Sequence, residues 1–145
     1  MPFRFRLQTL LSLRASLEKH AESALQRIQA EVAQMVHNIA EKDDAIAHAR
    51  GDWQALLRVS ATAFQLSSML EAENSLRSEK AGLEEALAQL TIRRDEQMRR
   101  YQQAHREHEV LLDIRKQRMA VYQQQQVRAQ QKLLDDIVMT RWPRG

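Results

Sequence analysis

The chain has 145 residues and a formal net charge of +3, and 28% of its residues are charged, yet it contains only 3 Gly, 2 Pro and no Cys. The lack of cysteine excludes a disulfide scaffold or a thiolate metal site, and no apolar stretch reaches the roughly 20 residues that cross a bilayer. Both prolines, Pro2 and Pro143, lie at the ends. Because proline is the strongest helix breaker, the composition predicts an almost entirely helical protein, and we expect it to be cytoplasmic.

The first stretch, FRFRLQTLLSLR, combines three arginines with Phe and Leu and has no acidic side chain. A transit peptide has this composition, but the leucines here continue in phase with the apolar residues downstream, which a removable segment does not require. The Phe and Arg residues at 3–6 form too short an apolar surface for secure membrane anchoring alone. We therefore interpret the stretch as the first turns of a long helix.

A first helix is predicted at about residues 7–58, because its apolar residues recur in alternating steps of four and three. This is the 3.5-residue repeat of a coiled-coil seam. The seam comprises Ala21, Leu25, Ile28, Val32, Met35, Ile39, Lys42, Ile46, Ala49, Trp53 and Leu56, with Lys42 as the only polar member. Upstream, Leu7, Leu10, Arg14 and Leu17 continue it, but the steps from Leu17 through Ala21 to Leu25 are both four. Such a stutter locally unwinds a supercoil.

The apolar repeat is lost between the two seams, where serine and threonine accumulate. We predict a turn at about residues 59–67. Ser68 followed by Glu71 has the spacing of a capping box, in which two side chains satisfy free backbone amides at a helix start.

A second helix is predicted at about residues 68–140, followed by a short C-terminal tail. Its seam comprises Leu76, Lys80, Leu83, Leu87, Leu90, Met98, Tyr101, His105, His108, Leu112, Arg115, Met119, Tyr122, Gln126, Ala129, Leu133 and Ile137, with a stutter at Arg94. The seam is rich in leucine at first and contains many polar residues after Tyr101. Polar seam residues cost stability and often set register or specificity, so this part either snorkels to solvent or is buried only inside a partner.

These elements predict an all-α fold, a long antiparallel two-helix coiled-coil hairpin that forms a single domain over residues 1–145. Helix two is longer, so it should overhang helix one at the open end. The chain should be a monomer when free. The rival fold is one continuous helix that dimerises in parallel.

Charge is distributed unevenly along the chain. Residues 1–30 hold five Lys/Arg and two acids (+3), residues 31–92 hold five and ten (−5), and residues 93–145 hold twelve and seven (+5). A hairpin would bring both basic segments to the open end, which could orient the protein on a partner. The basic residues are interspersed with acids and form no dense block before a leucine repeat, so we expect no nucleic-acid binding.

The sequence also lacks catalytic and cofactor motifs. The stretch HREHE does not have the paired-histidine spacing of a metalloprotease helix, and there is no glycine-rich phosphate loop or nucleophile elbow. We therefore expect no enzyme activity, no metal or other cofactor, and no small-molecule substrate.

Both ends of the chain resemble the FliJ family of flagellar export proteins, through FRFRLQTLLSLR at the start and QQKLLDDIVMTR near the end. The resemblance implies a stalk that docks in the hexameric flagellar export ATPase, promotes its assembly and activity, and links it to the membrane export gate. It also implies contact with export chaperones, a role in motility, and a cytoplasmic position on the inner face of the membrane. The implied ATPase-binding residues are Phe3, Arg4, Phe5, Arg6, Leu7, Leu10, Leu11, Arg14, Leu134, Asp135, Asp136, Ile137 and Arg141.

The middle of the chain has no distinctive motif for the export gate. We place candidate gate contacts among the apolar residues near the turn, on the general argument that exposed apolar patches bind partners; they are Phe64, Leu66, Met69 and Leu70.

Two alternatives to the flagellar stalk remain open. One is the equivalent stalk of a virulence injectisome, which has the same architecture and a different ATPase partner. The other is a general coiled-coil scaffold or membrane-surface adaptor, whose binding to anionic vesicles should require Arg4 and Arg6.

Overall fold

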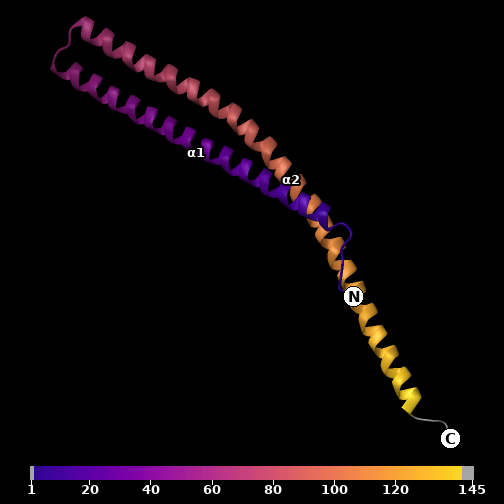
Figure 1. The fold of residues 1–145 in the computed structure, drawn as a ribbon. Helices are drawn as coiled ribbons and strands as arrows, with labels where there is room; N and C mark the ends of the chain where they lie inside the picture. Colours follow the sequence, from indigo (N-terminus) through magenta and orange to yellow (C-terminus); the bar gives the residue numbers. More distant parts are fainter. Residues whose placement is uncertain (1, 142–145) are drawn as a thin grey trace. The chain divides into compact units, whose positions relative to one another are not determined.

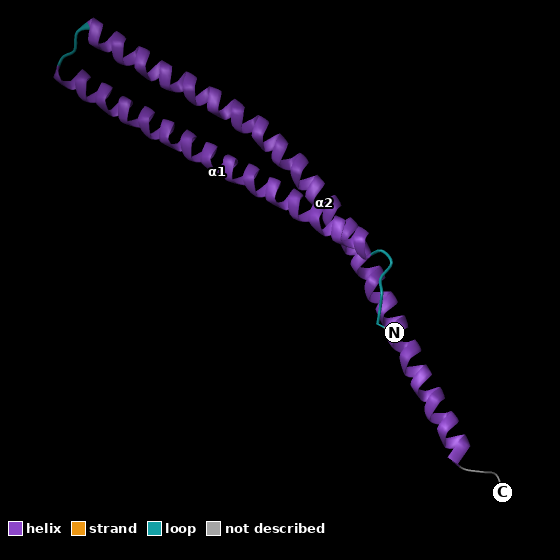
Figure 2. Ribbon diagram, in the orientation of Figure 1, coloured by secondary structure: helices purple, strands orange, loops and turns teal. Residues whose placement is uncertain are grey.

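Two long helices form the protein, and the computed structural model describes residues 2–141. Helix α1 covers Gln8–Val59 (52 residues) and helix α2 covers Ala63–Arg141 (79 residues). They pack against each other as a helical hairpin, and the described residues include no strand (Figures 1 and 2). The predicted fold class is thus confirmed. The short C-terminal tail that the sequence predicts lies outside the described residues.

The connection between the helices is shorter than predicted, because α2 begins at Ala63 instead of at about residue 68. The backbone N–H of Gln65 donates to Thr62 Oγ1 and the backbone N–H of Thr62 donates to Gln65 Oε1, both at 3.2 Å. This reciprocal pair is a capping box. The helix therefore starts at the first of two similar sequence signals, and the predicted box at Ser68 and Glu71 falls inside α2.

Ser60 ends α1 in an unusual backbone conformation, with φ of 118°. Its N–H donates to the carbonyl of Leu56 at 3.3 Å. Helices commonly end on a residue of positive φ, and that residue is usually glycine, since a Cβ is strained there.

We expect Ser60→Gly to raise the free energy of unfolding by about 1 kcal/mol, because relief of backbone strain exceeds the extra entropy that glycine loses on folding. Thermal unfolding followed by circular dichroism measures the change. Ser60→Ala is the matched control, since it removes the hydroxyl but keeps the Cβ and should give no gain. Equal stabilisation by both variants would contradict the argument.

Close packing divides the chain into two compact units. Unit 2 is Ala21–Tyr101 and unit 1 contains the described parts of residues 1–20 and 102–145.

In unit 2 the predicted seam is confirmed on both helices. All eleven seam residues of α1 from Ala21 to Leu56 are buried or half-buried, and so are those of α2 from Leu76 to Tyr101. Leu25 and Leu90 are the most deeply buried. The side-chain amide of Gln97 also donates to the carbonyl of Ala21 at 3.1 Å.

The two lysines in the seam of unit 2 each reach an acid on the opposite helix. Lys42 Nζ lies 2.6 Å from Glu79, and Lys80 Nζ lies 2.5 Å from Asp43. The hydrogen bond to Asp43 is the main reason why the pKa of Lys80 is raised. Polar seam residues with matched partners favour one register over its alternatives, so these pairs help to fix the antiparallel alignment.

Nearer the turn, Glu73 of α2 joins two arginines. Its Oε1 lies 2.9 Å from Arg77 on the same helix and 3.0 Å from Arg50 on α1. Hydrogen bonds from Arg77 and then Arg50 hold the pKa of Glu73 below its ordinary value.

Unit 1 has a small apolar core of Phe5, Leu11 and Leu111, against which Phe3, Leu7, Leu112 and Ile114 pack. The predicted seam is wrong here in its register on α1. Leu10 and Leu17 are 37% and 45% exposed, whereas Leu11 is 6% exposed and Glu18 is half-buried. The seam of α1 therefore runs through residues 7, 11, 14, 18, 21 and 25, which alternates steps of four and three without the predicted stutter.

Candidate functional site

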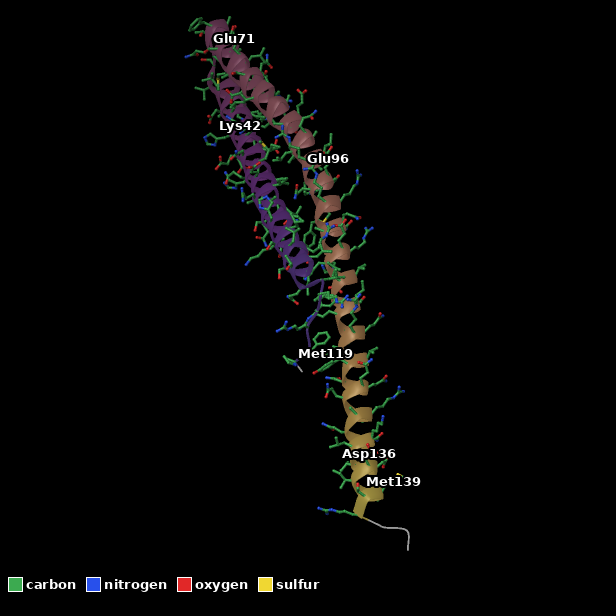
Figure 3. The ribbon with its side chains drawn as sticks, turned by 45° about the vertical axis from the view of Figure 1, so that its right-hand side comes forward. Lys42, Glu71, Glu96, Met119, Asp136 and Met139 are labelled. Carbon is green, nitrogen blue, oxygen red and sulfur yellow. The ribbon has the colours of Figure 1, made fainter. Side chains whose placement is uncertain are left out.

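The last part of α2, residues 123–141, lies beyond the segment that packs on it. Tyr122 is the final half-buried residue, and every residue from 123 to 141 is exposed. The side chains of Asp136 and Met139 extend from this part of the helix with no second helix beside it (Figure 3). We call residues 123–141 the exposed segment.

Apolar side chains lie along one side of the exposed segment. They are Val127, Leu133, Leu134, Ile137 and Val138, and they are 43–64% exposed. Residues three, four and seven apart share a helix face, so these five form one stripe, while Arg128, Lys132, Asp135 and Asp136 occupy the other side. We call these five residues the apolar stripe. An amphipathic helix of this kind fits an apolar groove on a partner protein.

The ATPase-binding residues predicted near the C-terminus all lie on the exposed segment. Leu134 and Ile137 belong to the apolar stripe, and Asp135, Asp136 and Arg141 are exposed beside it. The sequence reasoning missed Val127, Leu133 and Val138, although continuing the helical spacing backward and forward from Leu134 would have found them.

The ATPase-binding residues predicted near the N-terminus are placed differently. Phe5 and Leu11 are buried, Phe3, Leu7 and Arg14 are half-buried, and Arg4, Arg6 and Leu10 are exposed. Some side chains of this group therefore pack in the interface with α2, and the others face solvent. Their role in binding an ATPase stays a prediction.

A non-helical N-terminal segment places Phe3 and Phe5 against α2. Residues 2–5 are not helical, and the N–H of Gln8 donates to the carbonyl of Phe5 at 3.0 Å where α1 begins. The ring of Phe3 lies 5.5 Å from that of Tyr122, and the guanidinium of Arg118 lies 5.6 Å above the ring of Phe5. Aromatic and cation–π contacts thus continue the packing past the start of the helix.

Near the turn, in unit 2, the four candidate gate contacts differ in exposure. Phe64 is 82% exposed and Leu70 is also exposed, whereas Leu66 and Met69 are half-buried. Val59, which the sequence reasoning did not select, is exposed as well. Phe64 and Val59 are the large apolar side chains most available to a partner here.

Unit 1 also contains a carboxylate held between two histidines. Oε1 of Glu18, on α1, lies 2.7 Å from Nδ1 of His105, and its Oε2 contacts Nδ1 of His108, both on α2. The hydrogen bond from His105 is the largest reason why the pKa of Glu18 is lowered, and His108 adds to it. The same hydrogen bond raises the pKa of His105, and the charge of Glu109 contributes to that rise.

This His–Glu–His group was not predicted, because the predicted seam passes through Leu17 and does not include Glu18. Counting back in steps of three and four from Ala21 places residue 18 in the seam, and that count was the signal available.

The described residues hold no group of three or more His, Asp or Glu side chains arranged to bind a metal ion. Within the same residues, no helix is apolar enough over a sufficient length to cross a membrane.

Comparison with known proteins identifies the family. A family model described as "Flagellar FliJ protein" matches residues 3–145, which is nearly the whole chain. No match to the chain was found among curated proteins or solved structures. With a match of this extent, the chain belongs to the flagellar FliJ protein family and is a flagellar protein associated with export.

Proposed function

We propose that this protein is a non-enzymatic stalk of the flagellar type III export apparatus, with the exposed segment of α2 docking in the hexameric export ATPase. The apolar stripe is the observation that carries the proposal, because five large apolar side chains lie in water on a helix without a neighbour. Family membership supplies the setting, and it favours the flagellar system over the virulence injectisome.

The two sides of the exposed segment suit a ring of similar subunits. One side is apolar and the other carries Arg128, Lys132, Asp135 and Asp136, so a helix in the pore meets the surrounding subunits with unlike surfaces. A ligand shifts an equilibrium only through unequal affinity for its states. Unequal contacts would therefore favour nucleotide binding or hydrolysis at some subunits over others, and would promote ring assembly.

The residues near the turn between α1 and α2 would bind the second partner, the membrane export gate. Phe64, Leu66, Met69 and Leu70 remain our candidates for contact with the membrane export gate, and the exposure of Phe64 supports that assignment. Such contacts would hold a cytoplasmic protein at the inner face of the membrane. Export chaperones are further partners in this proposal.

The proposal is tested by mixing the purified protein with its cognate export ATPase. We expect the hydrolysis rate to rise and the two proteins to elute together as an assembled ring. Anionic phospholipid vesicles form the second arm, since a membrane-surface adaptor would bind them through Arg4 and Arg6. No change in rate and no co-elution would reject the stalk, and vesicle binding lost in Arg4→Ala/Arg6→Ala would then favour the adaptor.

A further inference from the structure

The His–Glu–His group joins α1 to α2 in unit 1 through both oxygens of one carboxylate. Glu18 and His108 are half-buried, and His105 is exposed at the edge of the seam. We propose that Glu18, His105 and His108 form a proton-dependent latch that holds the first turns of α1 on α2 in mildly acidic solution and loosens as the pH rises. This proposal does not depend on the proposed function.

Hydrogen bonding explains how the latch responds to protons. A carboxylate can only accept hydrogen bonds, so Nδ1 of each histidine carries the proton that it shares with Glu18. A protonated imidazole makes a charge-assisted bond roughly twice as strong as a neutral one. When His105 loses its second proton, from Nε2, its contact with Glu18 becomes a neutral hydrogen bond and the latch weakens.

The pKa directions set the pH range. The pKa of His105 is raised above 6.5 by Glu18, so its contribution to pairing is complete below 6.5 and is lost as the pH rises through the raised value. The pKa of Glu18 is lowered below 4.5, first by His105, so its contribution is complete above 4.5 and is lost as the pH falls through the lowered value. The latch is therefore tightest between these two limits.

The charged groups around the latch come from both helices. Nε2 of His105 lies 3.9 Å from Glu109, which adds a second acid on the side of α2. One turn away, Nη1 of Arg14 lies 2.5 Å from Glu107, whose other oxygen accepts a hydrogen bond from Gln103. The other ionisable side chains within four residues of the latch along the chain are the half-buried Tyr101 and the exposed Lys19, His20, Glu22 and Arg106.

Loosening of the latch would affect a defined surface. The first turns of α1 cover Leu111 and Leu112 of α2, and Leu11 packs on them. Separation of residues 8–20 from α2 would expose this apolar face to solvent or to a partner. The latch would thus make access to that face depend on pH.

The absence of native cysteine allows the separation to be measured directly, with spin labels on two introduced cysteines. Ser16 on α1 and Gln102 on α2 are exposed positions in unit 1, and Ala33 and Gln89 are exposed positions for a control pair in unit 2. Distance distributions are recorded by pulsed electron paramagnetic resonance between pH 5.5 and 8.5. We expect the separated fraction of the unit 1 pair to rise at least roughly threefold over this range, with no change in the unit 2 pair.

Two variants test whether the latch causes the pH dependence of the separated fraction. Glu18→Gln keeps the shape of the side chain but removes its charge and one of its two acceptor oxygens, so the separated fraction should no longer depend on pH. Arg14→Gln removes a cross-helix ion pair that contains no histidine, so it should raise the separated fraction at every pH and retain the pH dependence. A distribution that is constant with pH in the unsubstituted protein would overturn the proposal, and so would a pH dependence that persists in Glu18→Gln.

Discussion

Replacing Phe5 by alanine is expected to release the N-terminal segment from α2, with a loss of about 2–4 kcal/mol in the pairing energy of unit 1. The ring of Phe5 is only 8% exposed, and it packs in a core with Leu11 and Leu111 beneath the guanidinium of Arg118. Because that core contains only three buried residues, neighbouring side chains cannot replace the lost contacts.

Amide hydrogen exchange at a fixed pH measures this loss locally. A penalty of about 3 kcal/mol should speed exchange of residues 8–20 by roughly 100-fold, while amides of unit 2 keep their protection. Leu11→Ala should have a similar effect. Leu10→Ala is the matched control, since Leu10 is 37% exposed and its loss should change exchange by only a few-fold. Equal effects of Leu10→Ala and Leu11→Ala would contradict the register of the seam in unit 1.

The seam of unit 2 could be predicted from the sequence because it is almost wholly apolar. When leucine, isoleucine and valine recur in steps of three and four, no other face of the helix competes for burial. Lys42 and Lys80 did not disturb that prediction, since each continues the spacing and each has an acid within reach on the opposite helix.

The register of unit 1 could not be predicted in the same way, because leucines occupy two faces of α1 there. Leu10 and Leu11 are adjacent, and apolarity alone does not say which of them is buried. The register is consistent with Glu18 in the seam, where its carboxylate accepts hydrogen bonds from His105 and His108 on the opposite helix. The spacing from Ala21 admits residue 18, but apolarity favours Leu17, and the contact that decides between them joins residues far apart in the chain.

Sequence periodicity also explains why only part of the candidate site could be predicted. The exposed segment carries its apolar residues on one short helix, so Leu134 and Ile137 could be selected from sequence. The burial of Phe5 depends on how residues 2–5 lie along α2, and a segment that is not helical has no repeat from which that position follows.

Leu134→Asp is expected to abolish activation of the export ATPase at concentrations where the unsubstituted protein activates fully. Leu134 is at the centre of the apolar stripe, between Val127 and Val138. If the stripe is buried in the ring, a carboxylate there must be desolvated without a partner, and the docking constant should weaken by about 30- to 1,000-fold. Titration of the hydrolysis rate against protein concentration measures this change.

Met139→Asp supplies the control that separates docking from helix stability. Met139 is 68% exposed on the opposite side of the same helix, and it lies in the last turn of α2, where the helix dipole disfavours an aspartate at least as much as at Leu134. Met139→Asp should therefore lose at least as much helicity by circular dichroism as Leu134→Asp, while only Leu134→Asp loses activation. In the proposed complex the ring of subunits surrounds the helix on all sides. Equal loss of ATPase activation in both variants would mean that the ring prefers neither side of the helix. The unequal contacts on which the stalk mechanism depends would then be absent.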